Sequence, residues 1–281
     1  MTETRVSGDR LEVGLAGPAD RPLLVLTRMA SRAAGIWDPL VECLASHFRV
    51  ASYDLRMPDS ERLDDPGEVF RRFARECCEV ADRLGHARFA VVGWNGGSHV
   101  ALRAAVDVPE RLLGCVLIGA FHPLPDMRPI QRGVDFMRAM LEHAGPELYA
   151  YYWFMSGLSP RFVAERFDEV TRLATARART DRFVRTDMER LDKWIRALRG
   201  QWVGEGELAA ISTPVLVLQP ALDRWHAGPT VEMGRALAAL VPGARLEVLE
   251  GVGSLAPLEI PAEIAQRIVA HLAPGDPSPA R

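Results

Sequence analysis

The stretch from Phe89 to Val106 constrains the fold of this chain more than any other. Phe89-Ala90-Val91-Val92 is a short, wholly apolar run, as a strand buried on both faces of a parallel sheet requires. It leads into Gly93-Trp94-Asn95-Gly96-Gly97, and apolar spacing then predicts a helix over 99–106. Gly93 and Gly97, each two positions from Asn95 between the strand and the helix, indicate a sharp turn at Asn95.

The same alternation of short apolar strands and amphipathic helices recurs along most of the chain. It predicts the α/β class, with a mostly parallel sheet and helices on both faces. The expected strands cover residues 11–15, 22–26, 48–53, 89–92, 113–118, 214–218 and 246–249. The expected helices cover residues 37–46, 69–84, 99–106, 231–240 and 261–272.

One long interval interrupts this alternation. Residues 121–211 have a helical pattern throughout and are rich in aromatic side chains. We therefore predict an α/β core formed by residues 1–121 and 208–273, with an inserted helical cap at 122–207. The last segment, 274–281, is rich in proline and polar residues and is expected to be disordered.

Composition limits the partners of the protein. A net charge of −3 over 281 residues creates no field that attracts nucleic acid or an anionic membrane. No apolar run is long enough to span a bilayer, and no secretion segment is expected. The four cysteines lack metal-ligand spacing. The expectation is a cytoplasmic monomer or homodimer that takes a small-molecule substrate and needs no metal or organic cofactor.

These features together resemble the α/β-hydrolase superfamily over nearly the whole chain. The most specific stretch is 89–118, in which strand, Gly-x-x-x-Gly turn, helix, Pro109-Glu110-Arg111 and a second strand follow in the family order. Trp37-Asp38-Pro39 and Tyr53-Asp54-Leu55-Arg56 match the early part. The branch containing 3-oxoadipate enol-lactonase looks most similar. The resemblance implies the α/β-hydrolase fold, with its helical cap over the carboxyl ends of the strands.

The resemblance also assigns the family's catalytic positions. The nucleophile of the G-x-S-x-G motif falls on Asn95, and an amide nitrogen is a very poor nucleophile. The acid falls on Asp223, which is intact, and the histidine falls on Ser254. The His-Gly pair of the early loop corresponds to Thr27-Arg28, and a later Gly-His-Gly turn has become Met57-Pro58-Asp59. Four changed motifs in readable surroundings indicate a natural departure from hydrolysis.

Each candidate side chain has two interpretations. Asn95 either directs its amide at a ligand or simply tolerates the positive φ of the turn. Asp223 either acts as a general base or ligand-binding anion, or caps the following helix. His122 and His226 follow expected strands and can replace the lost base, but loop histidines are often merely solvated. Ser254 is inert unless another group activates it.

Backbone amides offer a second kind of site. The family's oxyanion donors correspond to the amide of Gly96 and an amide near Met29, and such a pair stabilises an oxyanion without a covalent step. Arg28 either adds positive charge there or forms a surface ion pair. In the cap, Tyr152 and Trp153 either line the ligand pocket or belong to the cap core.

The sequence therefore predicts an enzyme that performs non-covalent acid–base and oxyanion chemistry on a carbonyl compound. Lyase, isomerase, cyclase and dehydratase reactions of specialised metabolism are the expected classes. Two alternatives remain open. One is a catalytically inactive protein that binds a small molecule, and the other is a hydrolase with an unorthodox water-activating site.

Overall fold

A computed structural model describes residues 2–5, 12–28, 35–53, 55, 66–122, 128–179, 203–224 and 230–273. Several predictions lie outside these described residues: the roles of Met29 and His226, the change at Met57-Pro58-Asp59, and the tail at 274–281. For Arg28, the structure describes the backbone alone.

A single eight-stranded sheet forms the centre of the molecule. Its strands are β1 (Thr2–Arg5), β2 (Glu12–Ala16), β3 (Leu23–Arg28), β4 (Arg49–Tyr53), β5 (Phe89–Trp94), β6 (Leu112–Ile118), β7 (Val215–Leu222) and β8 (Arg245–Gly253). Their order in space is β1-β2-β4-β3-β5-β6-β7-β8. The pairs from β4 to β8 are all parallel, whereas β2 is antiparallel to both of its neighbours. The predicted mostly parallel sheet is confirmed.

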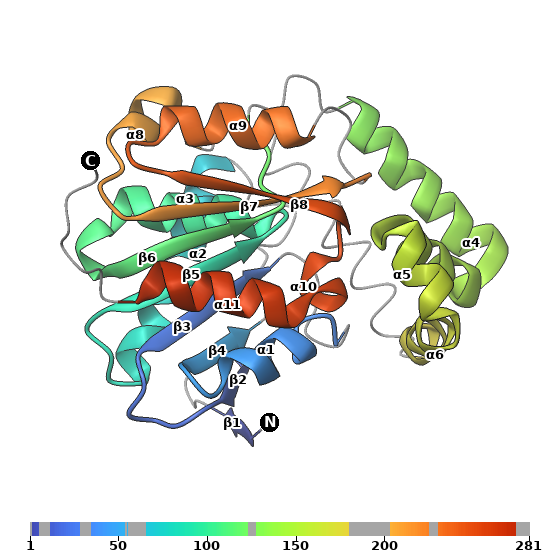
Figure 1. The fold of residues 1–281 in the computed structure, drawn as a ribbon, viewed down its shortest axis with the longest axis horizontal. Helices are drawn as coiled ribbons and strands as arrows, with labels where there is room; N and C mark the ends of the chain where they lie inside the picture. The colour runs from blue at the N-terminus through green and yellow to red at the C-terminus, as the bar shows by residue number, and fades with distance from the viewer. Residues whose placement is uncertain are drawn as a thin grey trace.

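Helices cover both faces of this sheet (Figure 1). They are α1 (Asp38–Leu44), α2 (Pro66–Arg83), α3 (Gly97–Asp107), α8 (Glu205–Ala209), α9 (Thr230–Leu240), α10 (Ala256–Glu259) and α11 (Pro261–Leu272), with a 3-10 turn at Pro109–Arg111. Helices α1, α10 and α11 lie on one face, and α2, α3 and α9 lie on the other.

The central strands read as apolar runs because both of their faces are buried. In β3, Leu24 and Leu26 join the apolar cluster on the α1 and α11 side, while Leu23 and Val25 join the cluster under α2 and α3. All residues of β5 are buried. The sheet is thus held between two apolar layers, and its carboxyl edge is positioned rigidly.

The helical insertion lies beyond the carboxyl ends of β7 and β8 (Figure 1). It contains α4 (Arg128–Gly157), α5 (Pro160–Glu165) and α6 (Phe167–Ala178), and α4 packs against α6. Helix α4 is kinked at Gly145, whose φ is 84°, directly before Pro146. No helix in the described segments is both long enough and apolar enough to cross a membrane.

Strand β1 has no counterpart among the sequence-based expectations. Its sequence, Thr-Glu-Thr-Arg, has no apolar alternation, which is the pattern that predicts a half-buried strand. The segment instead pairs along the edge of the sheet, where Thr2 to Arg5 lie opposite Leu15 to Glu12. Main-chain pairing with β2 defines this edge strand.

Candidate functional site

The turn between β5 and α3 is enforced by the main chain. Asn95 has a φ of 52° and is the sole non-glycine residue with positive φ in the described part of the chain. A Cβ atom on Gly93 would lie 2.5 Å from the carbonyl oxygen of Gly97 and 2.6 Å from the Cα of Ser98. The backbone amide of Asn95 donates to the carbonyl of Ile118, at 2.8 Å. The sharp turn expected at Asn95 is therefore present.

Two buried hydroxyl groups donate hydrogen bonds to backbone carbonyls of this turn. Thr27 Oγ1 in β3 donates to the carbonyl of Gly97 at 3.0 Å, with the Val92 carbonyl at 3.3 Å. Ser98 Oγ donates to the carbonyl of Gly93 at 3.2 Å and lies 3.4 Å from that of Ile118. Both side chains are thereby committed to main-chain acceptors of the turn.

The side chain of Asn95 folds back onto its own turn. Its Oδ1 accepts a hydrogen bond from the backbone N–H of Gly96, with a nitrogen–oxygen distance of 2.6 Å. That N–H is the amide that the resemblance assigns as an oxyanion donor. The carboxamide oxygen therefore occupies this donor and fixes the orientation of the whole amide group, including Nδ2.

Asp223 and Ser254 form the second part of the site. They follow the ends of β7 and β8, whose register pairs Leu222 with Gly253. Ser254 Oγ donates to Asp223 Oδ1 at 2.6 Å and accepts the backbone N–H of Arg224 at 3.3 Å. Ser254 is 3% exposed, so this short hydrogen bond is largely shielded from water.

One hydrogen bond links the residue before Asn95 to this pair. Trp94, which precedes Asn95, donates its indole Nε1–H to the carbonyl of Ser254 at 2.8 Å. A Cβ atom on Gly119, directly after β6, would lie 3.6 Å from Asp223 Oδ2. Asn95, Asp223 and Ser254 each directly follow the carboxyl end of a strand, β5, β7 and β8 respectively, and so lie along the same edge of the sheet. In open α/β sheets, ligands bind at this edge.

His122 lies at the end of β6 and is 6% exposed. Burial lowers the pKa of its imidazole, and the carboxylate of Glu205 in α8 only partly opposes that shift. The ring is consequently neutral near pH 7 and able to accept a proton. Glu205 begins α8, and this helix packs against α3 and α9 on one face of the sheet.

The two aromatic residues predicted in the cap have different surroundings. Trp153 is buried, with its ring centroid 5.2 Å from that of Phe154 and the Arg177 guanidinium 3.9 Å from its own centroid. Tyr152 is 38% exposed, and its ring packs against Phe136 with centroids 5.5 Å apart. Trp153 therefore contributes to the cap interior, whereas Tyr152 is partly exposed to solvent.

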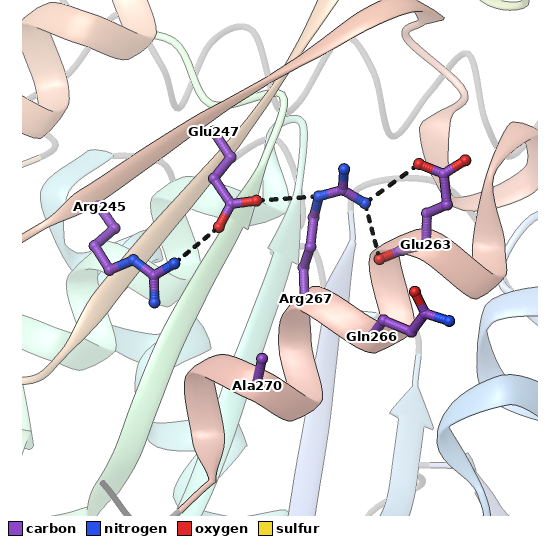
Figure 2. Close-up of a pocket in the computed structure, with 6 residues that line it drawn as sticks. All are labelled: Arg245, Glu247, Glu263, Gln266, Arg267 and Ala270. Carbon is purple, nitrogen blue, oxygen red and sulfur yellow. Dashed lines mark hydrogen bonds and ion pairs between the residues drawn. The ribbon is translucent and has the colours of Figure 1, made fainter. Parts of the chain in front are cut away.

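A separate surface pocket lies between β8 and α11 (Figure 2). Its charges form a continuous chain in which Glu247 accepts from Arg245 and Arg267, and Arg267 also contacts Glu263. Because β8 starts at Arg245 and ends before Ser254, this pocket lies toward the opposite end of the strand. Across the described residues, no cluster of three His, Cys, Asp or Glu side chains is suited to a metal ion.

Sequence reasoning does not single out Trp94 or Glu259, although both contact the backbone beside Ser254. Trp94 Nε1 donates to the Ser254 carbonyl, and Glu259 Oε2 accepts the backbone N–H of Gly253. Each looks ordinary in sequence, as an apolar residue after a strand and a carboxylate before a proline. Their roles depend on contacts between segments that are far apart along the chain.

Comparisons with known proteins agree on one family. The profile of a family described as alpha/beta hydrolase fold matches residues 22–259. Rhodomycin D methylesterase DauP of Streptomyces sp. (strain C5) is 30% identical over 287 aligned positions, covering 92% of this chain and 93% of DauP. RutD of Caulobacter vibrioides, provisionally named a carbamate hydrolase, is 29% identical over 153 residues. That match spans 54% of this chain and 56% of RutD.

Solved structures show the same architecture. The enol-lactonase from Burkholderia xenovorans LB400 superposes with a TM-score of 0.74, covering 93% of this chain and 96% of that enzyme. At 20% sequence identity, this likeness concerns the fold alone.

The expectation of lyase, isomerase, cyclase or dehydratase chemistry is wrong. DauP and RutD, which share sequence with this chain, are both named as hydrolases. The expectation rested on Asn95, which offers no nucleophile for a covalent acyl-enzyme. Water can also attack an acyl carbon directly, so an asparagine at this turn does not by itself indicate a different reaction class.

Proposed function

This chain belongs to the alpha/beta hydrolase fold family, and from that premise we propose that it hydrolyses a carboxylic ester or related acyl bond in a small organic molecule. The observation that carries the proposal is the 2.6 Å hydrogen bond between Ser254 and Asp223. It leaves an oriented carboxylate beside the turn of Asn95. The relationship to a methylesterase over 92% of the chain supports the bond type.

In this proposal, Asn95 and Ser254 stand where the family carries its serine nucleophile and histidine base. Support for Asn95 comes from its positive φ at the turn between β5 and α3. Support for Ser254 comes from its hydrogen bond to Asp223 at the ends of β7 and β8. With an amide at position 95, no covalent acyl-enzyme can form at this turn.

Asp223 then acts as the general base toward water. Its Oδ1 is engaged by the Ser254 hydroxyl, which orients the carboxylate, and Oδ2 accepts a proton from the attacking water. The water oxygen bonds to the carbonyl carbon, and negative charge develops on the carbonyl oxygen. When the carbon–oxygen bond to the alcohol breaks, Asp223 returns the proton to the leaving oxygen. The products are a carboxylic acid and an alcohol.

Asn95 serves this reaction as a hydrogen-bond donor. The Gly96 N–H donates to its Oδ1 at 2.6 Å and orients the carboxamide, in which Nδ2 is the donor atom. A donor aimed at the carbonyl oxygen stabilises the charge that develops there in the transition state. This role replaces the backbone amide that the Asn95 side chain occupies.

Hydrolysis of 4-nitrophenyl acetate by the purified chain tests the proposal. We expect Asp223→Asn to lower kcat/KM by about 100-fold or more, since general-base catalysis contributes that much. Glu263→Gln, on the remote face of α11, is the matched control and should leave the rate unchanged. An Asp223→Asn variant as active as the wild type would show that this carboxylate is not the base.

The absence of a covalent intermediate is tested separately. Intact-mass measurement after incubation with a serine-directed fluorophosphonate is expected to show no adduct. Loss of esterase activity together with an adduct on a serine of this chain would overturn the water-activating route. The same measurement on an ordinary serine esterase confirms that the reagent is active.

A second candidate function is binding of a small molecule without turnover. One observation favours it: the Gly96 N–H, the expected oxyanion donor, is already held by Asn95 Oδ1. Native mass spectrometry with a panel of methyl esters separates the two functions. An ester bound unaltered after prolonged incubation supports the binding function, whereas release of its acid supports hydrolysis.

A further inference from the structure

The carboxylate of Glu259 lies between the cap and the core. Its Oε2 accepts the backbone N–H of Gly253 at 3.0 Å and the backbone N–H of Ser159 at 3.0 Å. Gly253 ends β8 and directly precedes Ser254, whereas Ser159 lies at the junction of α4 and α5 in the cap. One oxygen atom therefore holds two segments that are far apart along the chain.

The two segments also touch through their main chains. A Cβ atom on Gly253 would lie 2.6 Å from the carbonyl oxygen of Gly157 and 2.8 Å from the nitrogen of Ser159. The backbone N–H of Leu255 donates to the same Gly157 carbonyl at 2.8 Å. The loop that carries Ser254 thus lies directly against the cap junction, in the region where α5 approaches α10 (Figure 1).

Local structure fixes the positions of both Ser159 and Glu259. Ser159 is buried and starts α5, because its hydroxyl accepts the backbone N–H of Phe162 at 3.2 Å. Glu259 is the last residue of α10, the short helix that follows Ser254. A carboxylate that accepts two backbone N–H groups forms charge-assisted hydrogen bonds, which are stronger than neutral ones.

We propose that Glu259 is a positioning residue that couples attachment of the cap to the placement of Ser254. If the carboxylate is lost, both amides lose their shared acceptor, and the cap junction and the end of β8 separate together. Trp94 reports this movement because its indole donates to the Ser254 carbonyl. The effect on catalysis rests on the proposed hydrolytic function, whereas the coupling itself does not.

Amide hydrogen exchange followed by NMR tests the coupling in the full chain. In Glu259→Ala, we expect the amides of Gly253 and Ser159 to exchange about tenfold faster, as loss of a hydrogen bond of ordinary strength requires. The Trp94 indole resonance, assigned with Trp94→Phe, should shift in the same variant.

Two further variants separate the contributions of the carboxylate. Glu259→Gln keeps an oxygen acceptor and should show a smaller change in both exchange rates. Glu263→Ala removes a carboxylate that pairs with Arg267 in the surface pocket, and it should change neither amide (Figure 2). If Glu259→Ala does not fold, Glu259→Asp, which is one methylene shorter, carries the same expectation.

Three outcomes would overturn the coupling. They are unchanged exchange at both amides, faster exchange at Ser159 alone, and faster exchange at Gly253 alone. Esterase assays distinguish this failure from failure of the proposed function. Coupled exchange in a chain that hydrolyses no ester supports the positioning role and removes the hydrolase proposal. In an active chain, Glu259→Ala should lower kcat more than it raises KM.

Discussion

The two halves of the candidate site are built by different means. The turn at Asn95 is enforced by backbone sterics, since a Cβ on Gly93 would lie 2.5 Å from the Gly97 carbonyl. The other half depends on side chains, through the hydrogen bond from Ser254 to Asp223 and the two amides held by Glu259. The turn at Asn95 is thus specified by steric exclusion of a side chain at Gly93, and the other half is specified by hydrogen bonding between polar atoms.

This difference explains how the turn accommodates asparagine at position 95 and keeps its shape. A turn that depends on its flanking glycines accepts any middle residue that tolerates positive φ, and asparagine does so better than most. A polar pair accepts change only if the new atoms still match. Replacing Asp223 or Ser254 alone leaves a shielded polar group without its counterpart, which costs free energy.

The largest expected effect tests the backbone half. Gly93→Ala should lower the free energy of unfolding by roughly 3 kcal/mol or more, because its Cβ meets main-chain atoms that cannot move aside. Gly133→Ala in α4 is the matched control, since its Cβ meets open space and alanine favours a helix. Equal losses in denaturant unfolding would refute the steric explanation.

The next effect tests whether positions 95 and 254 lie close enough to Asp223 for a serine and a histidine placed there to act together with it. The double substitution Asn95→Ser and Ser254→His should raise hydrolysis of 4-nitrophenyl acetate by about 100-fold, since it supplies a nucleophile and base beside Asp223. The fluorophosphonate should then label the hydroxyl introduced by Asn95→Ser, and the single variants serve as controls. A stably folded double variant without labelling would contradict the assignment of these positions.

A smaller effect separates the two roles of Asn95. Asn95→Ala and Asn95→Gly both remove the oxygen that holds the Gly96 N–H, but only alanine is strained at a φ of 52°. We expect the alanine variant to be less stable than the glycine variant by about 1 kcal/mol in urea unfolding. Equal free energies of unfolding would mean that the positive φ of position 95 does not strain an alanine there.

The smallest expected effect concerns His122, in the loop that follows β6. Burial lowers its pKa below the usual 6.5, so the unfolded chain binds a proton more readily than the folded one. The stability that this residue contributes is therefore present above pH 6.5 and is lost as pH falls toward the lowered folded pKa. Urea unfolding of His122→Gln across this range should show a shallower loss than the wild type. Identical pH dependence would contradict a buried neutral imidazole.

Much of the fold could be predicted from local pattern. The strand at 89–94 is apolar throughout because both faces of the sheet are covered, and the glycines after it require a turn. Strand β1 escaped prediction because its residues have no apolar period, and only pairing with β2 makes it a strand. The sequence does not predict the reaction class correctly, because an asparagine at position 95 argues against one mechanism without excluding hydrolysis.

The sequence by itself determined the buried strands of the sheet, the long helices that cover them and the turn at Asn95, because burial on two faces and glycine sterics are local properties of a short segment. Only the tertiary structure decided that Ser254 bonds Asp223, that Asn95 occupies the Gly96 amide, and that Glu259 joins the cap to the core. These contacts depend on distances between side chains and amides brought together by the sheet register and the docking of the cap, and no periodicity in the chain encodes such distances.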